Sequence, residues 1–154
     1  MARKTFSGLP PYPVSLAGSL LAAREAVMAP IRPVLREANF TEQQWRVLRV
    51  LGDAEFLDAK GIADQALLHA PTVTRILKEL GDRKLIARQL DRSDARRSIV
   101  SITPKGREIV SDTARRTRLL LKEYAEAFGP ERLEALKAEA LALAEALRRF
   151  DKEE

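Results

Sequence analysis

Two groups of basic residues near the middle of the chain have the types and spacing that contact nucleic acid. Arg75 and Lys78 lie three residues apart and would share one face of a helix. A second group, Arg92, Arg96 and Arg97, falls within one short polar stretch. Lysine and arginine bind phosphate oxygens, and arginine also reads base edges and narrow minor grooves. Their chemistry therefore predicts contact with a polyanion.

The first group belongs to a segment with helical periodicity, residues 70–82. Its apolar positions fall on one face and leave the polar residues outside. We expect phosphate contacts from Lys78 and base-edge contacts from the others. The apolar face holds Val73, Ile76, Leu77 and Leu80, and the outer positions are Thr72, Thr74, Arg75 and Lys78.

The second group lies between two β-prone runs, residues 85–90 and 98–103, which predict a hairpin. Its tip, residues 91–97, contains the three arginines, and we assign phosphate contacts to Arg92 and Arg97, and with them to Arg46. A helix followed by a hairpin with a basic tip is typical of a winged helix-turn-helix. The carboxylates Asp91 and Asp94 are explained by turn chemistry at the tip.

The basic charge is concentrated in this region. Residues 71–107 contain ten Lys and Arg against four Asp and Glu, a net charge of +6, whereas the whole chain carries +5. The remainder is therefore nearly neutral, which favours a polyanionic partner bound at one place. The alternative is a solvated charged face with no partner.

Composition excludes several other classes. The chain of 154 residues has no cysteine and a single histidine, His69, so disulfides, cysteine nucleophiles and multi-histidine metal sites are excluded. It has no Gly-rich phosphate loop or metal-ligand cluster, so we expect neither an enzyme nor a cofactor or metal. We find no apolar run long enough to span a membrane and no secretion signal, and expect a cytoplasmic protein.

The flanking segments predict further helices. Residues 1–13 are rich in proline and predict a flexible arm. Residues 15–37 predict a helix that bends or breaks at Pro30, because an internal proline removes a hydrogen bond. Thr41 and Gln44 have the spacing of a capping box for the next helix, and Asp58 is placed to cap residues 59–67.

The C-terminal part predicts two long helices, residues 104–127 and 131–150. The second has an apolar seam with heptad spacing, which predicts packing on a second copy of the chain. The alternative is an intramolecular bundle with the helix that begins at Pro104. The seam consists of Leu133, Leu136, Ala140, Leu143, Leu147 and Phe150.

Several motifs together resemble the MarR family of bacterial transcriptional regulators, over residues 15–150. They are Pro71-Thr72-Val73-Thr74-Arg75, Asp94-Ala95-Arg96-Arg97 and Thr103-Pro104-Lys105-Gly106. Ala23-Arg24-Glu25-Ala26, Arg32-Pro33 and Thr41-Glu42-Gln43-Gln44-Trp45-Arg46 resemble the HpaR-type repressors of homoprotocatechuate (4-hydroxyphenylacetate) degradation operons. Two positions depart from the family pattern: Lys84 stands where a glycine usually ends the recognition helix, and His69 or Ala70 stands where a serine often caps it.

The resemblance implies a mostly α-helical fold with a small β-hairpin wing. It implies one domain over residues 14–154, with a winged helix-turn-helix over 41–103 and dimerisation helices over 15–37 and 104–150. It also implies a homodimer on a palindromic double-stranded DNA operator, with Arg96 in the minor groove and Asp94 bracing the wing. Family members are often released from DNA by an aromatic carboxylate or a phenol.

A site for such an effector needs a cation and an apolar wall. We expect it to form from Arg24 and Met28 on the first helix with Trp45 and Arg46 on the next. The alternative is that Trp45 belongs to the core and the arginines form ion pairs.

The sequence therefore predicts a sequence-specific DNA-binding regulator, a repressor released by a small aromatic acid. The competing hypothesis is a helical dimer whose winged lobe binds proteins without specific DNA binding.

Overall fold

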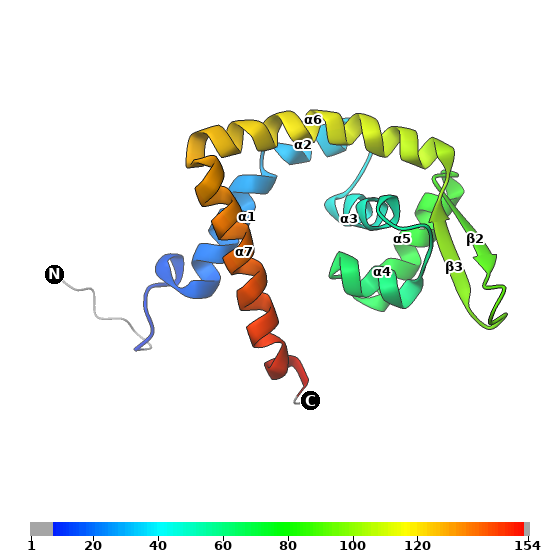
Figure 1. Cartoon of the computed structure of the whole chain (residues 1–154), viewed down its shortest axis with the longest axis horizontal. Coiled ribbons are helices and arrows are strands. Elements are labelled where there is room, and N and C mark those ends of the chain that lie inside the picture. Colours follow the sequence, from blue (N-terminus) through cyan, green and yellow to red (C-terminus); the bar gives the residue numbers. More distant parts are fainter. Residues whose placement is uncertain (1–7, 153–154) are drawn as a thin grey trace. The chain divides into compact units, whose positions relative to one another are not determined.

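The computed structural model describes residues 8–152 of the chain (Figure 1). The helices are η1 (Tyr12–Val14), α1 (Leu16–Met28), α2 (Ile31–Glu37), α3 (Glu42–Gly52), α4 (Ala59–Ala66), α5 (Ala70–Asp82), α6 (Pro104–Phe128), α7 (Pro130–Leu147) and η2 (Arg148–Lys152). The strands are β1 (Leu57–Asp58), β2 (Ile86–Leu90) and β3 (Ser98–Ile102). The predicted class, mostly α-helical with a small hairpin wing, is confirmed. Among the described residues, none of the helices is both long and apolar enough to cross a bilayer.

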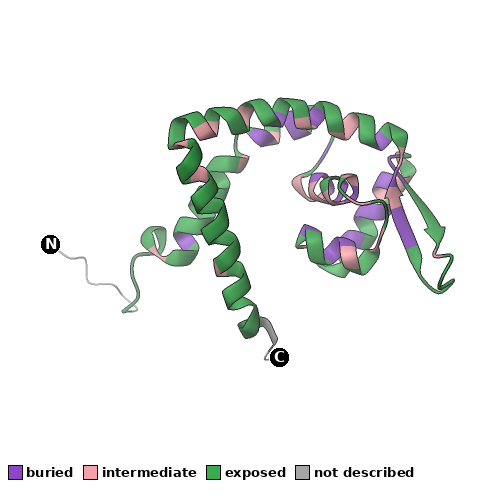
Figure 2. Ribbon diagram, in the orientation of Figure 1, coloured by how far each residue is buried: buried purple, intermediate pink, exposed green. Residues whose placement is uncertain are grey.

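The chain divides into two compact units, and the boundary between Arg116 and Thr117 falls inside α6. Figure 2 shows that the buried residues concentrate in the first unit, along α2 to α5, the strands and the first half of α6, whereas α7 is mostly exposed. The expectation of a single domain over residues 14–154 stays a prediction.

The core of the first unit lies where α3, α4 and α5 meet the sheet. Every one of these helices turns an apolar face inward, as the 3.6-residue periodicity predicts. The fully buried side chains with the largest volumes include Leu48, Leu51, Ile62, Val73, Ile76, Leu80, Leu85 and Val100. This core fixes the orientation of α5, so that its polar face points outward.

The sheet has three antiparallel strands in the order β1-β3-β2. In the hairpin, Ile86 pairs with Ile102 and Leu90 pairs with Ser98. The short strand β1, which sequence patterns did not predict, adds the pair Leu57 and Val100 at the other edge of β3. It connects the wing directly to the residues that precede α4.

Helix ends follow the predicted capping chemistry. Thr41 and Gln44 form a reciprocal capping box at the start of α3, and the side chain of Asp58 accepts a hydrogen bond from the Gly61 amide at the start of α4. The predicted break at Pro30 is confirmed, because α1 ends at Met28 and α2 begins at Ile31.

The N-terminal arm differs in part from the prediction. Tyr12–Val14 forms the 3₁₀ helix η1, and Ser15 Oγ both donates to Tyr12 O at 2.7 Å and accepts from the Gly18 amide at 3.1 Å. A β-carbon on Gly18 would lie 1.9 Å from Tyr12 O, so glycine permits this close turn. The rest of the expected arm, residues 1–7, lies outside the described residues.

The end of α5 is a Schellman turn with a left-handed lysine. Lys84 has φ +59°, its amide donates to Gly81 O at 2.9 Å, and the Leu85 amide donates to Leu80 O at 3.0 Å. The departure from glycine at this position suggested a different turn, whereas the structure keeps the left-handed turn with lysine in it. Thr103 ties the same turn to α6, since its hydroxyl donates to Lys84 O at 2.8 Å and accepts from the Gly106 amide at 3.1 Å.

The second unit contains the rest of α6 and the helix α7. None of the residues of α7, all of which the structure describes, is buried. Leu141 is 73% exposed, and Leu136 and Leu147 are also exposed. The predicted end of this helix at Phe150 is wrong, because α7 ends at Leu147 and Phe150 lies in the 3₁₀ helix η2.

Candidate nucleic-acid interface

The outer face of α5 presents the residues predicted to contact DNA. Thr74, Arg75 and Lys78 are exposed and Thr72 is half-buried, while the opposite face is in the core. The hydroxyl of Thr74 donates to Ala70 O at 3.1 Å, within its own helix. His69 occupies the N-cap position, and its side chain makes no capping hydrogen bond.

Arg75 is held by a neighbour on the same helix. Its Nη1 donates to Glu79 Oε1 at 2.9 Å, and Glu79 Oε2 accepts from Gln44 Nε2 at 2.8 Å. The hydrogen bond from Gln44, followed by that from Arg75, lowers the pKa of the Glu79 carboxyl. Sequence reasoning missed this contact, because Gln44 and Glu79 lie on different helices.

At the wing tip, Arg92 and Arg96 are exposed and the two carboxylates organise the turn. Asp94 Oδ1 accepts from the Arg96 amide at 3.0 Å. Asp91 Oδ1 accepts from the Ser93 amide at 2.9 Å and from the Ser93 hydroxyl at 2.7 Å. The bonds from the Ser93 and Arg96 amides are the side-chain-to-backbone bonds that aspartate makes in turns.

Arg97 is the last residue of the wing tip, directly before β3, and has a partner that the sequence did not suggest. Its Nη2 lies 2.6 Å from Asp58 Oδ2, in the residue that caps α4. The Gly61 amide and then the Arg97 guanidinium lower the pKa of Asp58. Asp58 therefore joins the wing to the first helix of the helix-turn-helix.

The two arginines predicted for an effector site have their polar contacts with other residues, and not with each other. Arg24 Nη2 lies 2.7 Å from Glu42 Oε2, whereas Arg46 Nη1 donates to the carbonyls of Ala66, at 3.0 Å, and Leu67, at 3.3 Å. Trp45 is buried in the core and Met28 is half-buried. These contacts favour the alternative in which Trp45 is a core residue.

Arg49 is the arginine that faces the Trp45 ring, with its guanidinium carbon 6.0 Å from the ring centroid. Arg49 follows Trp45 by one helical turn, so the i, i+4 spacing could have predicted this contact from the sequence.

Close to Arg24, an ion-pair cluster joins α1 and α2 to the first turn of α3. Glu42 pairs with Arg24 and Arg32, and Arg32 Nη2 also lies 2.8 Å from Glu25 Oε2. The side-chain hydrogen bonds from Arg32 and then Arg24 lower the pKa of Glu42. The Glu42 carboxyl therefore stays ionised at pH values below the usual pKa of a glutamate.

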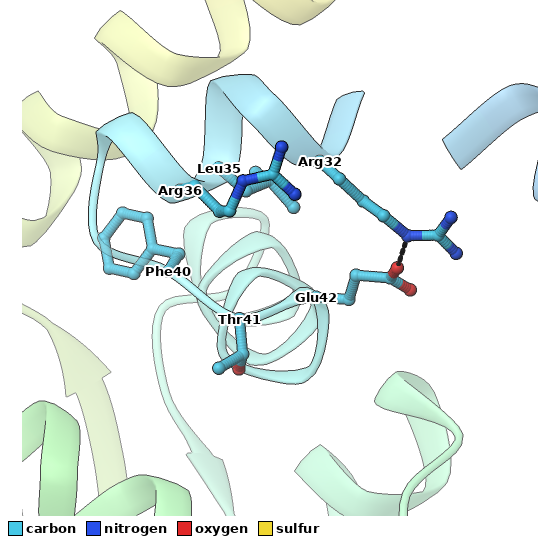
Figure 3. Close-up of a pocket in the computed structure, with 6 residues that line it drawn as sticks. All are labelled: Arg32, Leu35, Arg36, Phe40, Thr41 and Glu42. Carbon is cyan, nitrogen blue, oxygen red and sulfur yellow. Dashed lines mark hydrogen bonds and ion pairs between the residues drawn. The ribbon is translucent and has the colours of Figure 1, made fainter. Parts of the chain in front are cut away.

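A cavity of about 210 Å³ opens beside this cluster, between α2 and α3 (Figure 3). Figure 3 shows Arg32 directed at Glu42, with Arg36 and the Phe40 ring on the other side of the opening. Arg36 and the Phe40 ring are groups that suit a small aromatic acid, whereas Arg32 is already paired with Glu42, which also lines the cavity. The residues that line the cavity are Arg32, Leu35, Arg36, Phe40, Thr41 and Glu42.

Comparison with known proteins places these features in a family. Residues 38–97 match the model of the MarR family. The chain is 34% identical over 118 residues to the HTH-type transcriptional regulator FarR of Neisseria gonorrhoeae, covering 77% of this chain and 81% of the relative. It is 30% identical over 122 residues to the homoprotocatechuate degradative operon repressor of Escherichia coli, covering 79% and 82%.

A solved structure is also similar to this chain, in sequence and in fold. The structure of NadR in complex with 4-hydroxyphenylacetate superposes with a TM-score of 0.79 at 32% identity, covering 88% of this chain and 96% of the other. Both relatives and this solved structure align with the chain over most of their length. The chain belongs to the MarR family of transcriptional regulators.

Proposed function

We propose that the protein binds double-stranded DNA in a sequence-specific manner and represses transcription, with a small aromatic acid as the signal for release. The observation that supports this most directly is the outward polar face of α5 beside a wing whose tip exposes Arg92 and Arg96. A helix that presents side chains of this kind fits the major groove. Relatives that are regulators of transcription support the same function.

Within this proposal, base reading belongs to α5. Thr72, Thr74 and Arg75 contact base edges, and Lys78 contacts a phosphate. At the wing, Arg92 contacts the backbone and Arg96 enters the minor groove, where it responds to groove width and negative potential.

Two other wing residues have supporting roles. Asp94 braces the tip through the amide of Arg96. Arg97 braces the end of the tip next to β3 through Asp58, and its remaining N–H donors are available for a phosphate.

We also propose that the functional unit is a homodimer. Helix α7 exposes leucines along its length and buries none of its residues, although helices in proteins gain most of their stability from packing of an apolar face. Helix α1 likewise exposes Leu16, Leu20 and Leu21. A second copy packed on the helices of residues 15–37 and 104–150 would cover these faces and match a palindromic operator. The winged part, residues 41–103, would bind DNA.

For the effector, we propose an aromatic carboxylate. The NadR relative was crystallised with 4-hydroxyphenylacetate, and this chain has arginines beside an aromatic wall at the α2–α3 cavity. Since Arg24 pairs with Glu42 in this structure, an acid that binds the predicted set of Arg24, Met28, Trp45 and Arg46 must displace a carboxylate. The cavity beside Arg32 and Arg36 requires no such displacement at Arg36.

The test is fluorescence anisotropy with the DNA that lies upstream of the protein's own gene, over a range of salt concentrations. Each phosphate contact contributes about 0.9 to the slope of log K against log salt, so we expect a slope of several units that decreases in Arg96→Ala. A binding constant that does not change with salt would contradict DNA binding and support the protein-binding alternative. Addition of 4-hydroxyphenylacetate tests the effector, and unchanged anisotropy at millimolar concentration would contradict it.

A further inference from the structure

We propose that Glu79 is a positioning residue that determines DNA specificity, because it holds Arg75 for base reading while Gln44 of α3 holds Glu79. This inference rests on the proposed DNA-binding function. It assigns a role to two residues, Gln44 and Glu79, that do not belong to the predicted DNA-contact set.

The contact geometry is a two-step chain from α3 to the outer face of α5. Gln44 Nε2 donates to Glu79 Oε2 at 2.8 Å, and Arg75 Nη1 donates to Glu79 Oε1 at 2.9 Å. Each carboxylate oxygen therefore has its own donor. The guanidinium and the carboxylate lie one helical turn apart on α5, at the i, i+4 spacing that allows this pairing.

The anchor of this chain is fixed more firmly than a surface ion pair. An exposed i, i+4 pair is usually mobile and contributes little. Gln44, however, is only 9% exposed, and its Oε1 accepts from the Thr41 amide at 3.1 Å in the capping box of α3. Both ends of the Gln44 amide are thus engaged, and Glu79 receives its hydrogen bond from a fixed direction.

The held carboxylate affects DNA binding in two ways. It preorders the Arg75 guanidinium, whose side chain is 61% exposed and otherwise free to adopt many rotamers. It also places a negative charge beside Arg75, and this charge disfavours complexes in which Arg75 contacts a DNA phosphate. Non-specific binding consists of such phosphate contacts, so the charge of Glu79 weakens non-specific binding, whereas the preordered Arg75 strengthens specific binding.

Two simpler roles for Glu79 make different predictions. If Glu79 only adds negative charge to α5, removal of another carboxylate on the same helix has the same effect. If Glu79 reads a base directly, as glutamate can at cytosine, then the contact from Gln44 is irrelevant. The variants below separate these roles.

The experiment uses the full-length protein and two labelled duplexes, one selected from a random library with the wild-type protein and one scrambled. The variants are Glu79→Gln, Gln44→Glu and, as the charge-matched control on α5, Asp82→Asn. Gln44→Glu keeps an oxygen for the Thr41 amide and loses the donor to Glu79, so the capping box survives. Arg75→Ala reports how much of the specificity depends on that arginine. Thermal unfolding checks that each variant is folded.

We expect Glu79→Gln to strengthen binding to scrambled DNA roughly threefold and to reduce the ratio of specific to scrambled affinity about tenfold. Gln44→Glu should reduce the same ratio, whereas Asp82→Asn should strengthen binding to both duplexes equally and leave the ratio unchanged. A ratio in Glu79→Gln or Gln44→Glu that stays within about twofold of wild type, while Arg75→Ala loses specificity, overturns the inference but not the proposed function. Wild-type protein that binds both duplexes equally overturns the proposed function, and the inference with it.

Discussion

Replacing Lys84 by glycine should stabilise the fold, because Lys84 adopts a backbone conformation that disfavours residues with a β-carbon. Its φ of +59° lies in the left-handed region, at the position of a Schellman turn that glycine usually occupies. Left-handed backbone costs an ordinary residue about 1–2 kcal/mol. Glycine avoids this cost, although its more flexible unfolded state offsets about 0.5–1 kcal/mol.

The expected net gain is therefore roughly 0.5–1 kcal/mol in the free energy of unfolding. For a chain of this size, that gain raises the melting temperature by about 1–4 °C. The turn itself should not change, because the hydrogen bonds from the amides of Lys84 and Leu85 and to the Lys84 carbonyl involve only backbone atoms of those residues. The measurement is urea denaturation at fixed protein concentration, with thermal unfolding as a second readout.

Two further substitutions at the same position separate backbone strain from charge. Lys84→Ala removes the ammonium group and keeps the β-carbon, so its stability should stay near that of wild type. Lys84→Asn should fall between alanine and glycine, because asparagine tolerates left-handed backbone. If alanine stabilises the protein as much as glycine does, loss of the positive charge explains the effect and the argument from backbone strain is refuted.

Three other predictions follow from close contacts and from titration. Gly106→Ala should destabilise the fold by about 1–3 kcal/mol, since its β-carbon would lie 2.2 Å from Leu85 O, whereas Gly81→Ala, with nothing within 4 Å, should gain about 0.5–1 kcal/mol in the same urea assay. Asp58→Ala, which removes the cap of α4 and the partner of Arg97, should cost about 0.5–2 kcal/mol. The pKa of Asp58 is lowered in the fold, so its ionised form stabilises the protein above the ordinary pKa of about 4, and this stabilisation should be lost as the pH falls through the depressed pKa. Asp58→Asn, which keeps a capping oxygen, should flatten that part of the pH profile of urea midpoints.

Local patterns predicted the elements of this fold well. The capping box at Thr41 and Gln44 and the recognition helix over residues 70–82 depend on neighbours within a few positions, and the structure confirms them. The strand β1 was missed because two residues carry no periodicity, and its pairing with β3 spans about forty positions of sequence.

The polar contacts of the site were harder to predict, because they also join residues that are far apart in the sequence. The side chains of Gln44 and Asp58 have local roles as caps, which sequence spacing revealed, but each also has a distant partner that spacing cannot identify. Arg46 is a similar case, because it donates to carbonyls at the end of α4, a contact that its residue type does not indicate, while its phosphate and effector contacts stay predictions. A long cation can satisfy any carbonyl within reach, so residue type alone does not determine its partner.

The junction between α5 and α6 limits how the recognition helix can respond to a signal. The Thr103 amide donates to Leu85 O at 3.0 Å, and the Thr103 hydroxyl bonds the turn on both sides. With these bonds intact, the last turn of α5 and the first turn of α6 move as one rigid body. A tilt of the start of α6 would therefore reorient the DNA-reading face of α5 without unwinding α5. The point about which the two helices rotate must lie outside this junction.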